Sequence, residues 1–319
     1  MRKLSICCLL LLVVATSNSQ TLIPYLNNNG KYVFVDSVFR TTAVDKDFDA
    51  VELFVNKVSP VRYFGKWGYI DKTGGNVIPY IYDEASNFRN GISFVNRNHK
   101  SVFINLKGDE QSNEEFDFVQ NFSEGYAVVA LNNKWGYIGQ NWLHDELIYE
   151  YANSFSDGLA SVCINKKWGF INTKFQIVIP FQYEHAGSFS EGLAPVMIVS
   201  KWGFINTKGI LVIPPLYENV TLFSNGLAGV LLGGKWSYVN KKGRIIFSVN
   251  YAEVREFSEG LAAIKVNGKW GFINKENKII IEPKYDEVNN FKNGYAWVYD
   301  SNSKFMINNL GKEYRAKRN

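Results

Sequence analysis

A period of about 34 residues runs through the chain and constrains its fold more than any other feature. A lysine followed by an aromatic-rich pentad recurs at steps of 33 to 35 residues, at Lys31, Lys66, Lys100, Lys134, Lys167, Lys201, Lys235, Lys269 and Lys304. A second marker keeps the same register, at Phe54, Phe88, Phe122, Phe155, Phe189, Phe223, Phe257 and Phe291. A chain of 319 residues would otherwise suggest two domains, whereas this self-similarity predicts one array of stacked modules.

One unit, from residue 192 to 223, has the pattern of a small antiparallel meander. Residues 193–198 place small or branched apolar side chains at every second position, which predicts a strand with one buried face. Residues 202–205 and 211–213 predict a second and a third strand. In other units Asn132-Asn133 or Asn267-Gly268 separates the first two strands, where a tight hairpin needs residues that tolerate positive φ. Each unit is therefore predicted to hold three strands and a connecting segment.

The composition agrees with a folded, strand-rich chain. Hydrophobic residues make up 46% of the sequence, aromatic residues 15% and charged residues 20%, which excludes a disordered or collagen-like polymer. Aromatic side chains favour strands over helices. The net charge of +5 is spread along the chain, so no clustered basic face is expected for nucleic acid.

The repeated motif resembles a known family. Lys-Trp-Gly followed by Tyr or Phe and Ile begins at residues 66, 134, 167, 201 and 269, Val-Ile-Pro at 77 and 178, and Phe-Ser-Glu-Gly at 122 and 189. These motifs resemble the WG (KWG) repeat family over about residues 22 to 311. The resemblance implies a bacterial, often exported, β-rich repeat protein without an established enzymatic activity. The motif loses its Trp after Lys31, Lys100 and Lys304, and Ser237 replaces its Gly.

We therefore expect an all-β array over residues 20–311, with eight full units and a truncated ninth, stacked as an open solenoid-like superhelix. A closed β-propeller is the alternative. Three strands in about 34 residues are short for a four-stranded blade, and nine units exceed the usual four to eight blades, so the sequence favours the open form.

The first residues predict export. Arg2 and Lys3 precede an apolar run and then small polar residues, which is the pattern of a secretory signal peptide over residues 1–19 with cleavage before Gln20. The apolar run is too short to span a bilayer, and no comparable run follows. The expected location is secreted, periplasmic or cell-surface. Cleavage would lower the formal charge to +3 and leave Cys163 as the only cysteine, which we expect to be a small core residue. Residues 312–319 are predicted to form a solvated basic tail.

Six tryptophans admit two interpretations. They are either core residues at the junctions of neighbouring units or an exposed ladder on which sugar rings or peptide could stack: Trp67, Trp135, Trp168, Trp202, Trp236 and Trp270. We expect core, because an exposed indole forfeits a large favourable burial term that short strands without a disulfide need. The Gly after each Trp supports this expectation, since a missing side chain permits close approach of a neighbouring backbone or ring.

Candidate binding residues occupy positions at which the residue type changes from unit to unit while the repeated motif stays constant. The first predicted strand varies at its third and fifth positions, and we expect these positions to form a binding strip together with the hairpin tips, or to be drift on a solvated face. The strip includes Phe94, Asn96, Pro195, Met197, Leu231, Lys265, Trp297 and Tyr299. Trp297 and Tyr299 form either a contact patch or a cap on the last unit.

No catalytic, cofactor or metal site is predicted. The acids that follow each unit's aromatic residue share one environment, whereas general acid–base catalysis needs two, so we expect them to accept turn amides or to face the repeated Lys: Asp49, Asp83, Asp117, Glu150, Glu184, Glu218 and Asp286. Asp45, Asp47 and Asp49 imitate a calcium loop, but Ala50 and Asn56 replace its required Gly and Glu. His99, His144 and His185 occupy different phases of the unit.

These observations predict an exported, non-enzymatic scaffold that binds a protein or a cell-surface component. A carbohydrate-binding protein that uses aromatic side chains is the alternative. A hydrolase built on the repeated acids is a further alternative, and fold alone does not settle activity.

Overall fold

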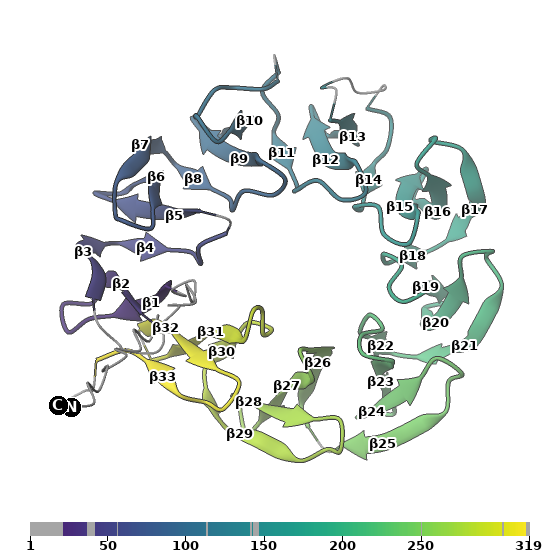
Figure 1. Cartoon of the computed structure of the whole chain (residues 1–319). Helices are drawn as coiled ribbons and strands as arrows, with labels where there is room; N and C mark the ends of the chain where they lie inside the picture. Colours follow the sequence, from purple (N-terminus) through teal and green to yellow (C-terminus); the bar gives the residue numbers. More distant parts are fainter. Residues whose placement is uncertain are drawn as a thin grey trace, which may run out of the picture.

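The chain forms a closed ring of small antiparallel sheets (Figure 1). The computed structural model describes residues 22–36, 42–55, 57–112, 114–140, 142, 147–249, 251–301 and 303–316. Within these residues 33 strands form nine sheets and no helix occurs, which confirms the all-β prediction. The expected open superhelix is wrong, because the sheets close as the nine blades of a β-propeller, the alternative arrangement. The predicted signal peptide and its cleavage site lie outside the described residues.

Of the first four blades, blades 1, 3 and 4 have three strands and blade 2 has four. Blade 1 holds β1 (Leu22–Leu26), β2 (Tyr32–Asp36) and β3 (Thr42–Phe48). Blade 2 holds β4 (Ala50–Val51), β5 (Val58–Tyr63), β6 (Lys66–Asp71) and β7 (Asn76–Tyr82). Blade 3 holds β8 (Glu84–Ala85), β9 (Ile92–Arg97) and β10 (Lys100–Asn105), and blade 4 holds β11 (Phe118–Val119), β12 (Tyr126–Leu131) and β13 (Lys134–Gly139).

The other five blades each have four strands. Blade 5 holds β14 (Tyr151–Ala152), β15 (Leu159–Ile164), β16 (Lys167–Asn172) and β17 (Ile177–Tyr183). Blade 6 holds β18 (His185–Ala186), β19 (Leu193–Ile198), β20 (Lys201–Asn206) and β21 (Leu211–Tyr217). Blade 7 holds β22 (Asn219–Val220), β23 (Leu227–Leu232), β24 (Lys235–Asn240) and β25 (Ile245–Val249). Blade 8 holds β26 (Glu253–Ser258), β27 (Leu261–Val266), β28 (Lys269–Asn274) and β29 (Ile279–Tyr285), and blade 9 holds β30 (Glu287–Val288), β31 (Tyr295–Asp300), β32 (Ser303–Asn308) and β33 (Glu313–Tyr314).

A two-residue strand in the predicted connecting segment supplies the missing fourth strand. In blade 6 this strand is β18, which pairs antiparallel with β19 on the inner side of the ring (Figure 1). Thirty-four residues therefore suffice for a four-stranded blade. The prediction of three-stranded units is therefore wrong, and the length of the unit does not argue against a closed propeller.

The repeated phenylalanine joins each blade to the blade before it. Phe189 of blade 6 packs against Phe170 on β16 of blade 5, with 4.9 Å between ring centroids and 58° between ring planes. The same pair recurs around the ring at 4.8 to 5.5 Å, as Phe34–Phe54, Tyr69–Phe88, Phe103–Phe122, Tyr137–Phe155, Phe204–Phe223, Tyr238–Phe257 and Phe272–Phe291. The core of the protein thus lies between blades, as the stacking of modules required.

The predicted hairpins are confirmed by their backbone angles. Asn132 and Asn133 have φ of 52° and 62°, and Asn267 and Gly268 have φ of 48° and 79°. Two successive positive φ values match the twist that a two-residue hairpin needs between right-handed strands.

Contacts between blade 9 and blade 1 close the ring. Leu26 of β1 forms a parallel bridge with Arg315, and the amide of Ala316 donates to the carbonyl of Leu26 at 2.8 Å. Tyr32 donates its hydroxyl to the carbonyl of Lys304 at 2.7 Å, and its ring meets Trp297 edge-on at 5.9 Å. The first and last described strands therefore share one core.

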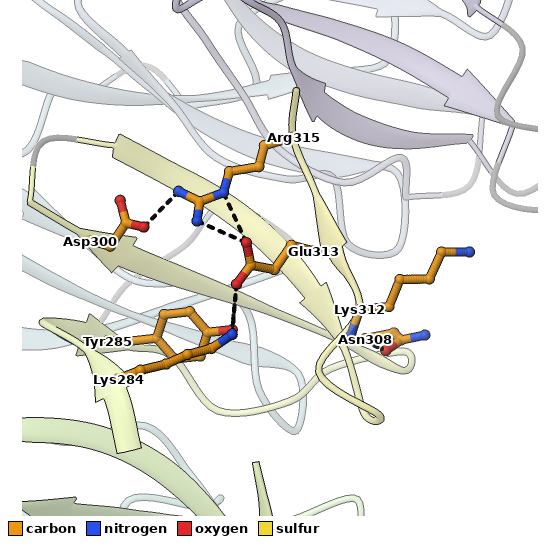
Figure 2. A network of polar contacts seen from close by, with 7 residues as sticks. All are labelled: Lys284, Tyr285, Asp300, Asn308, Lys312, Glu313 and Arg315. Carbon is orange, nitrogen blue, oxygen red and sulfur yellow. Dashed lines mark hydrogen bonds and ion pairs between the residues drawn. The ribbon is translucent and has the colours of Figure 1, made fainter. Parts of the chain in front are cut away.

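An ionic network anchors Arg315, whose backbone makes the contact with blade 1, to blades 8 and 9 (Figure 2). Arg315 donates to Asp300 at 2.6 Å and to Glu313 at 2.9 Å, and Glu313 also accepts from Lys284 at 2.9 Å and Tyr285 at 3.2 Å. Burial opposes ionisation of Glu313, but Lys284 and Arg315 outweigh it, so the pKa of this carboxyl lies below its ordinary value. Residues 313–316 belong to the ninth blade and to this network, so the expected solvated tail and truncated ninth unit are both corrected.

The pairing of blade 9 also corrects the register of the last repeat. Lys304 lies opposite Tyr299, the position that Trp202 takes opposite Met197 in blade 6. Ser303 therefore occupies the place of the repeated Lys, and Lys304 the place of the Trp.

The Gly after the repeated Trp lies on the third strand of the blade, where the backbone of the outer strand passes closest to it. A Cβ on Gly203 would lie 2.5 Å from the carbonyl oxygen of Ile213 and 2.8 Å from the nitrogen of Pro215. This confirms the predicted close approach of a backbone. In blade 7 Ser237 lies opposite Ser248 in regular register, so β25 leaves room for its side chain.

We expect Gly203→Ala to lower the free energy of unfolding by about 1 to 3 kcal/mol, because the added methyl group overlaps backbone atoms that cannot move independently. Urea unfolding followed by circular dichroism measures this change. Ser237→Ala is the matched control and should change stability by no more than about 0.5 kcal/mol. Equal effects of the two substitutions would contradict the close-approach argument.

We expect Glu313→Gln to destabilise the chain at pH 7 by about 1 kcal/mol, since it removes a charged acceptor of Lys284 and Arg315. Because the folded pKa of Glu313 is depressed, its contribution is present above the unfolded value near 4.5 and is lost as the pH falls through the folded pKa. Urea midpoints of the two proteins should therefore converge as the pH is lowered from 4.5 through the folded pKa of Glu313. Glu276→Gln, on an exposed turn, is the control, and a difference that persists at low pH would refute the ionic explanation.

Candidate functional site

The repeated Trp lies in a row of side chains that crosses each blade. In blade 5 Trp168 of β16 lies opposite Cys163 of β15, and Cys163 lies opposite Tyr151 of β14. Tyr183 of β17 lies opposite Trp168 on its other side. Because opposite residues of an antiparallel sheet share a face, these side chains form one row beside the hairpin between β15 and β16. We call the end of the ring that carries these hairpins the hairpin face.

In blades 4, 5 and 6 these rows join into one chain of aromatic rings, which we call the aromatic arc. Its members are, in order, Phe118, Trp135, Tyr151, Trp168, His185 and Trp202. Successive ring centroids lie 4.9, 5.7, 6.4, 6.5 and 6.4 Å apart. The members alternate between the first and third strands of a blade, so the aromatic arc crosses two blade boundaries without a break.

The aromatic arc is open to solvent. Tyr151 is 57% exposed and Phe118 38% exposed, His185 is exposed, and the three indoles are half-buried. Tyr151 lies nearly parallel to Trp168, with 19° between the ring planes. The apolar surface of an exposed ring is removed from water only when a partner covers it, which is favourable. Six partly exposed rings in succession therefore form a surface suited to binding.

The charges beside the aromatic arc differ from those of other units. In blades 1, 2, 3 and 8 the repeated Lys pairs with an Asp, as Lys66 pairs with Asp83. In blades 4 to 6 a Glu takes that place, and Lys134, Lys167 and Lys201 make no ion pair with any described residue. Among the described residues these three lysines beside the aromatic arc have no ion-pair partner, although Lys134 helps to lower the pKa of Glu150.

The repeated acids tie neighbouring blades, which confirms the predicted structural role. Asp83 accepts from Lys66 of blade 2 and, at 2.9 Å, from the amide of Asn98 at the hairpin tip of blade 3. The Lys66 ammonium and then this amide hold the pKa of Asp83 below its usual value. Glu184 likewise accepts from the amide of Ser200 at 2.9 Å.

Two of the six repeat tryptophans are core residues. Trp236 is 6% exposed and Trp270 is 2% exposed, and Arg255 covers the Trp270 ring at 4.3 Å. The core prediction is confirmed for this pair. The other four indoles, Trp67, Trp135, Trp168 and Trp202, are half-buried, because the row lies at the end of the strands where the neighbouring blade covers only part of each ring.

The predicted binding strip is less accessible than the sequence suggested. Pro195 and Trp297 are buried and Phe94 is half-buried against the core between blades 3 and 4, because the second strand has a neighbouring blade on each side. The fifth-position residues are half-buried: Asn96, Met197, Leu231, Lys265 and Tyr299. Of these, Met197 lies opposite both His185 and Trp202, within the aromatic arc.

Trp297 and Tyr299 lie at the closure of the ring. The Lys304 ammonium lies 4.4 Å from the Trp297 ring and 5.9 Å from the Tyr299 ring. Nearby, burial raises the pKa of Glu52, while Lys304, the Trp297 indole and Lys292 oppose the rise.

The remaining candidates carry no assembled site. No cluster of three metal-ligating side chains occurs in the described part of the chain. Asp49 of the calcium-like stretch accepts from Lys31 and the amide of Gly65, and His144 and Asn56 lie outside the described residues. Cys163 is buried, and burial followed by Glu150 raises the pKa of its thiol to about 11, which keeps it protonated at neutral pH.

Sequence reasoning missed Tyr151 and Phe118 and left His185 without a role. Each directly follows one of the repeated acids, at a position held by Ala50, Glu84, Asn219 or Glu287 in other units. Variation at this position, like the variation used to choose the strip, was the available indication.

Comparison with known proteins gives a family and a fold. The model of the WG containing repeat matches residues 67–100, 103–135, 146–168, 168–201, 202–236, 236–270 and 270–304. A eukaryotic initiation factor has a similar structure, with a TM-score of 0.64 and 10% identity over 93% of this chain and 95% of that one. Hsv2p of Kluyveromyces lactis matches with a TM-score of 0.45 and 9% identity over 72% of this chain and 94% of that one. No curated protein matches the sequence.

Identities this low concern the fold alone. No helix in the described residues is long and apolar enough to cross a membrane. With seven matches that follow one another through most of its length, the chain belongs to the family of WG containing repeat proteins.

Proposed function

We propose that this chain is an exported, non-enzymatic scaffold that binds a protein or a cell-surface component through the aromatic arc. Export rests on the pattern of residues 1–19. The observation that carries the binding role is the unbroken succession of six partly exposed rings over blades 4 to 6. Aromatic side chains supply large contact area at a small cost in side-chain entropy, and they dominate binding energy at interfaces.

The rest of the ring supports a scaffold role. The repeated aromatic contacts and the acids that bridge blades fix the hairpin face, while the first-strand residue of each row changes from Tyr151 to His185 to Asn219 without disturbing the core. A rigid frame with variable residues at one end is the arrangement by which repeat proteins present a binding surface.

A polysaccharide is the second candidate ligand, and one observation favours it. Tyr151 and Trp168 of blade 5 present nearly parallel rings, and exposed Asn side chains lie at hairpin tips of this blade and of the preceding one, Asn165 and Asn132. Flat apolar rings beside amide groups suit a sugar, which has an apolar face and hydroxyl groups at its edge.

We expect Tyr151→Ser and His185→Ser to weaken binding at least tenfold each while leaving the urea midpoint unchanged, because both side chains are exposed. A glycan array and an immobilised cell-surface protein fraction supply the probes, and affinity for the positive probe is then measured by titration. Indole fluorescence should also become less accessible to acrylamide when the probe is bound.

Phe64→Ser is the matched control, because Phe64 is 86% exposed at a hairpin tip of blade 2 outside the aromatic arc. A loss of affinity in this control equal to that of Tyr151→Ser, or unchanged binding in both arc variants, would refute the proposed surface. A positive glycan together with a negative protein fraction would select the polysaccharide.

A further inference from the structure

The outer strands of blades 5 to 8 expose a pair of aliphatic residues each. The pairs are Ile177-Val178 in β17, Leu211-Val212 in β21, Ile245-Ile246 in β25 and Ile279-Ile280 in β29, with exposures from 37% to 61%. These strands follow one another along the outer edge of the ring (Figure 1). We call these eight residues the aliphatic band.

A shift of register brings both members of each pair outward. Ile171 lies opposite Ile177 and Phe170 lies opposite Ile179, so Val178 has no opposite residue. Ile179 is buried while its two predecessors face solvent. The same shift recurs in blades 6, 7 and 8, which repeats the exposed pair at the start of each outer strand.

Cations lie in the turns that lead into these strands. The four turns contain seven basic residues and one acid: Lys174, Lys208, Lys241, Lys242, Arg244, Lys275 and Lys278, with Glu276. Lys241 pairs with Glu191 at 3.1 Å, and the other six make no ion pair within the described residues. All seven are exposed. The aliphatic band is therefore bordered by a surplus of positive charge.

The other described turns of this kind lack the combination. In blade 2 Asp71 and Asn76 flank Lys72, in blade 3 Asp109 and Glu110 lead into the outer segment, and in blade 9 Glu313 follows Lys312. Among the turns that the structure describes, aliphatic pairs and unpaired cations thus coincide in four consecutive blades, whereas drift on a solvated surface would scatter them.

The outer edges are also blocked against added strands. Pro180, Pro214, Pro215 and Pro283 lie in three of these four edge strands and remove amide donors that a partner strand needs. A partner of the aliphatic band must therefore bind through side chains rather than through backbone pairing, which disfavours a peptide strand or the edge of a second copy.

Acidic side chains at the same end of the ring lie in the turns that lead into the second strands. Asp157 accepts from the amide of Gly192, Glu191 from that of Gly226, and Glu259 from that of Gly294, at 2.7 to 3.0 Å. These carboxylates are thus held by the amides of the next blade. Glu191 also pairs with Lys241, which leaves six of the seven bordering cations without an ion pair among the described residues.

We propose that the aliphatic band and its bordering cations bind the surface of an anionic lipid bilayer. The aliphatic pairs enter the headgroup region, and the lysines meet lipid phosphates. Apolar side chains bordered by Lys and Arg are the pattern of interfacial membrane binding, in which penetration is about 5 to 10 Å. The unpaired backbone of the edge strands restricts binding to this shallow depth, because a backbone without hydrogen-bond partners does not enter the hydrocarbon.

Vesicle sedimentation of the full chain tests this proposal. We expect binding to vesicles of phosphatidylcholine with 30% phosphatidylglycerol, little binding to pure phosphatidylcholine, and release by about 0.5 M salt. The triple variant Lys174→Gln, Lys208→Gln, Lys242→Gln should reduce the partition coefficient on the order of 100-fold, since each lysine near an anionic surface contributes about fivefold. Ile177→Ser, Leu211→Ser, Ile245→Ser should reduce it as well.

The matched control is Lys57→Gln, Lys72→Gln, Lys107→Gln, which removes the same charge from exposed lysines of blades 2 and 3. A loss in this control equal to that of the test variant would overturn the proposal, because net charge would then explain binding. So would absence of binding to anionic vesicles, or a concentration-dependent dimer that the Ser variant abolishes, since the aliphatic band would then be an interface between copies. Circular dichroism and urea unfolding show that each variant is folded, and arc-dependent ligand binding is measured separately.

Discussion

The contact between an aromatic ring on the third strand of one blade and the phenylalanine of the next blade holds this ring together. It recurs at nearly the same distance at eight boundaries, from Phe34–Phe54 to Phe272–Phe291. A blade of three or four short strands has too little core of its own, so the free energy of folding comes from the boundaries between blades. The ninth boundary uses different residues, with Tyr32, Trp297 and the backbone bridge from Arg315 to Leu26, because the two ends of the array meet there.

Because the stabilising contacts lie at the boundaries between blades, residues at the ends of the strands can vary without loss of the fold. On the hairpin face the first-strand residue of the row is a ring in blades 4 to 6, whereas it is Ala50, Glu84, Asn219, Glu253 or Glu287 in blades 2, 3, 7, 8 and 9. At the opposite end, the turns into the outer strands are basic and followed by aliphatic pairs in blades 5 to 8. Each surface extends over adjacent blades, and each is a property of the ring that no single unit possesses. One ring can therefore carry two independent binding surfaces at its two ends.

The local parts of the candidate site were predictable, and their assembly was not. The repeated Trp and the variable fifth position of the second strand are visible in the sequence, and Met197 indeed lies beside Trp202. Tyr151 and His185 could not be joined to the indoles from sequence, because the contacts cross a blade boundary and depend on how far neighbouring blades are rotated. For the same reason the third position of the strip, exemplified by Pro195, was expected outside the core and is buried.

The strands, the hairpins and the close approach at Gly203 could be predicted from the amino-acid sequence, since each depends on residues within one unit: alternation, tolerance of positive φ and the absence of a Cβ. Closure of the array could not be predicted in this way and became evident in the three-dimensional structure. Closure depends on the small rotation between successive blades, which accumulates over nine of them, and on a first strand of two residues that is too short to leave a periodic pattern. Interactions between the first and last blades then hold the ring closed. These contacts join residues almost 300 positions apart, and a 34-residue repeat pattern gives no indication of them.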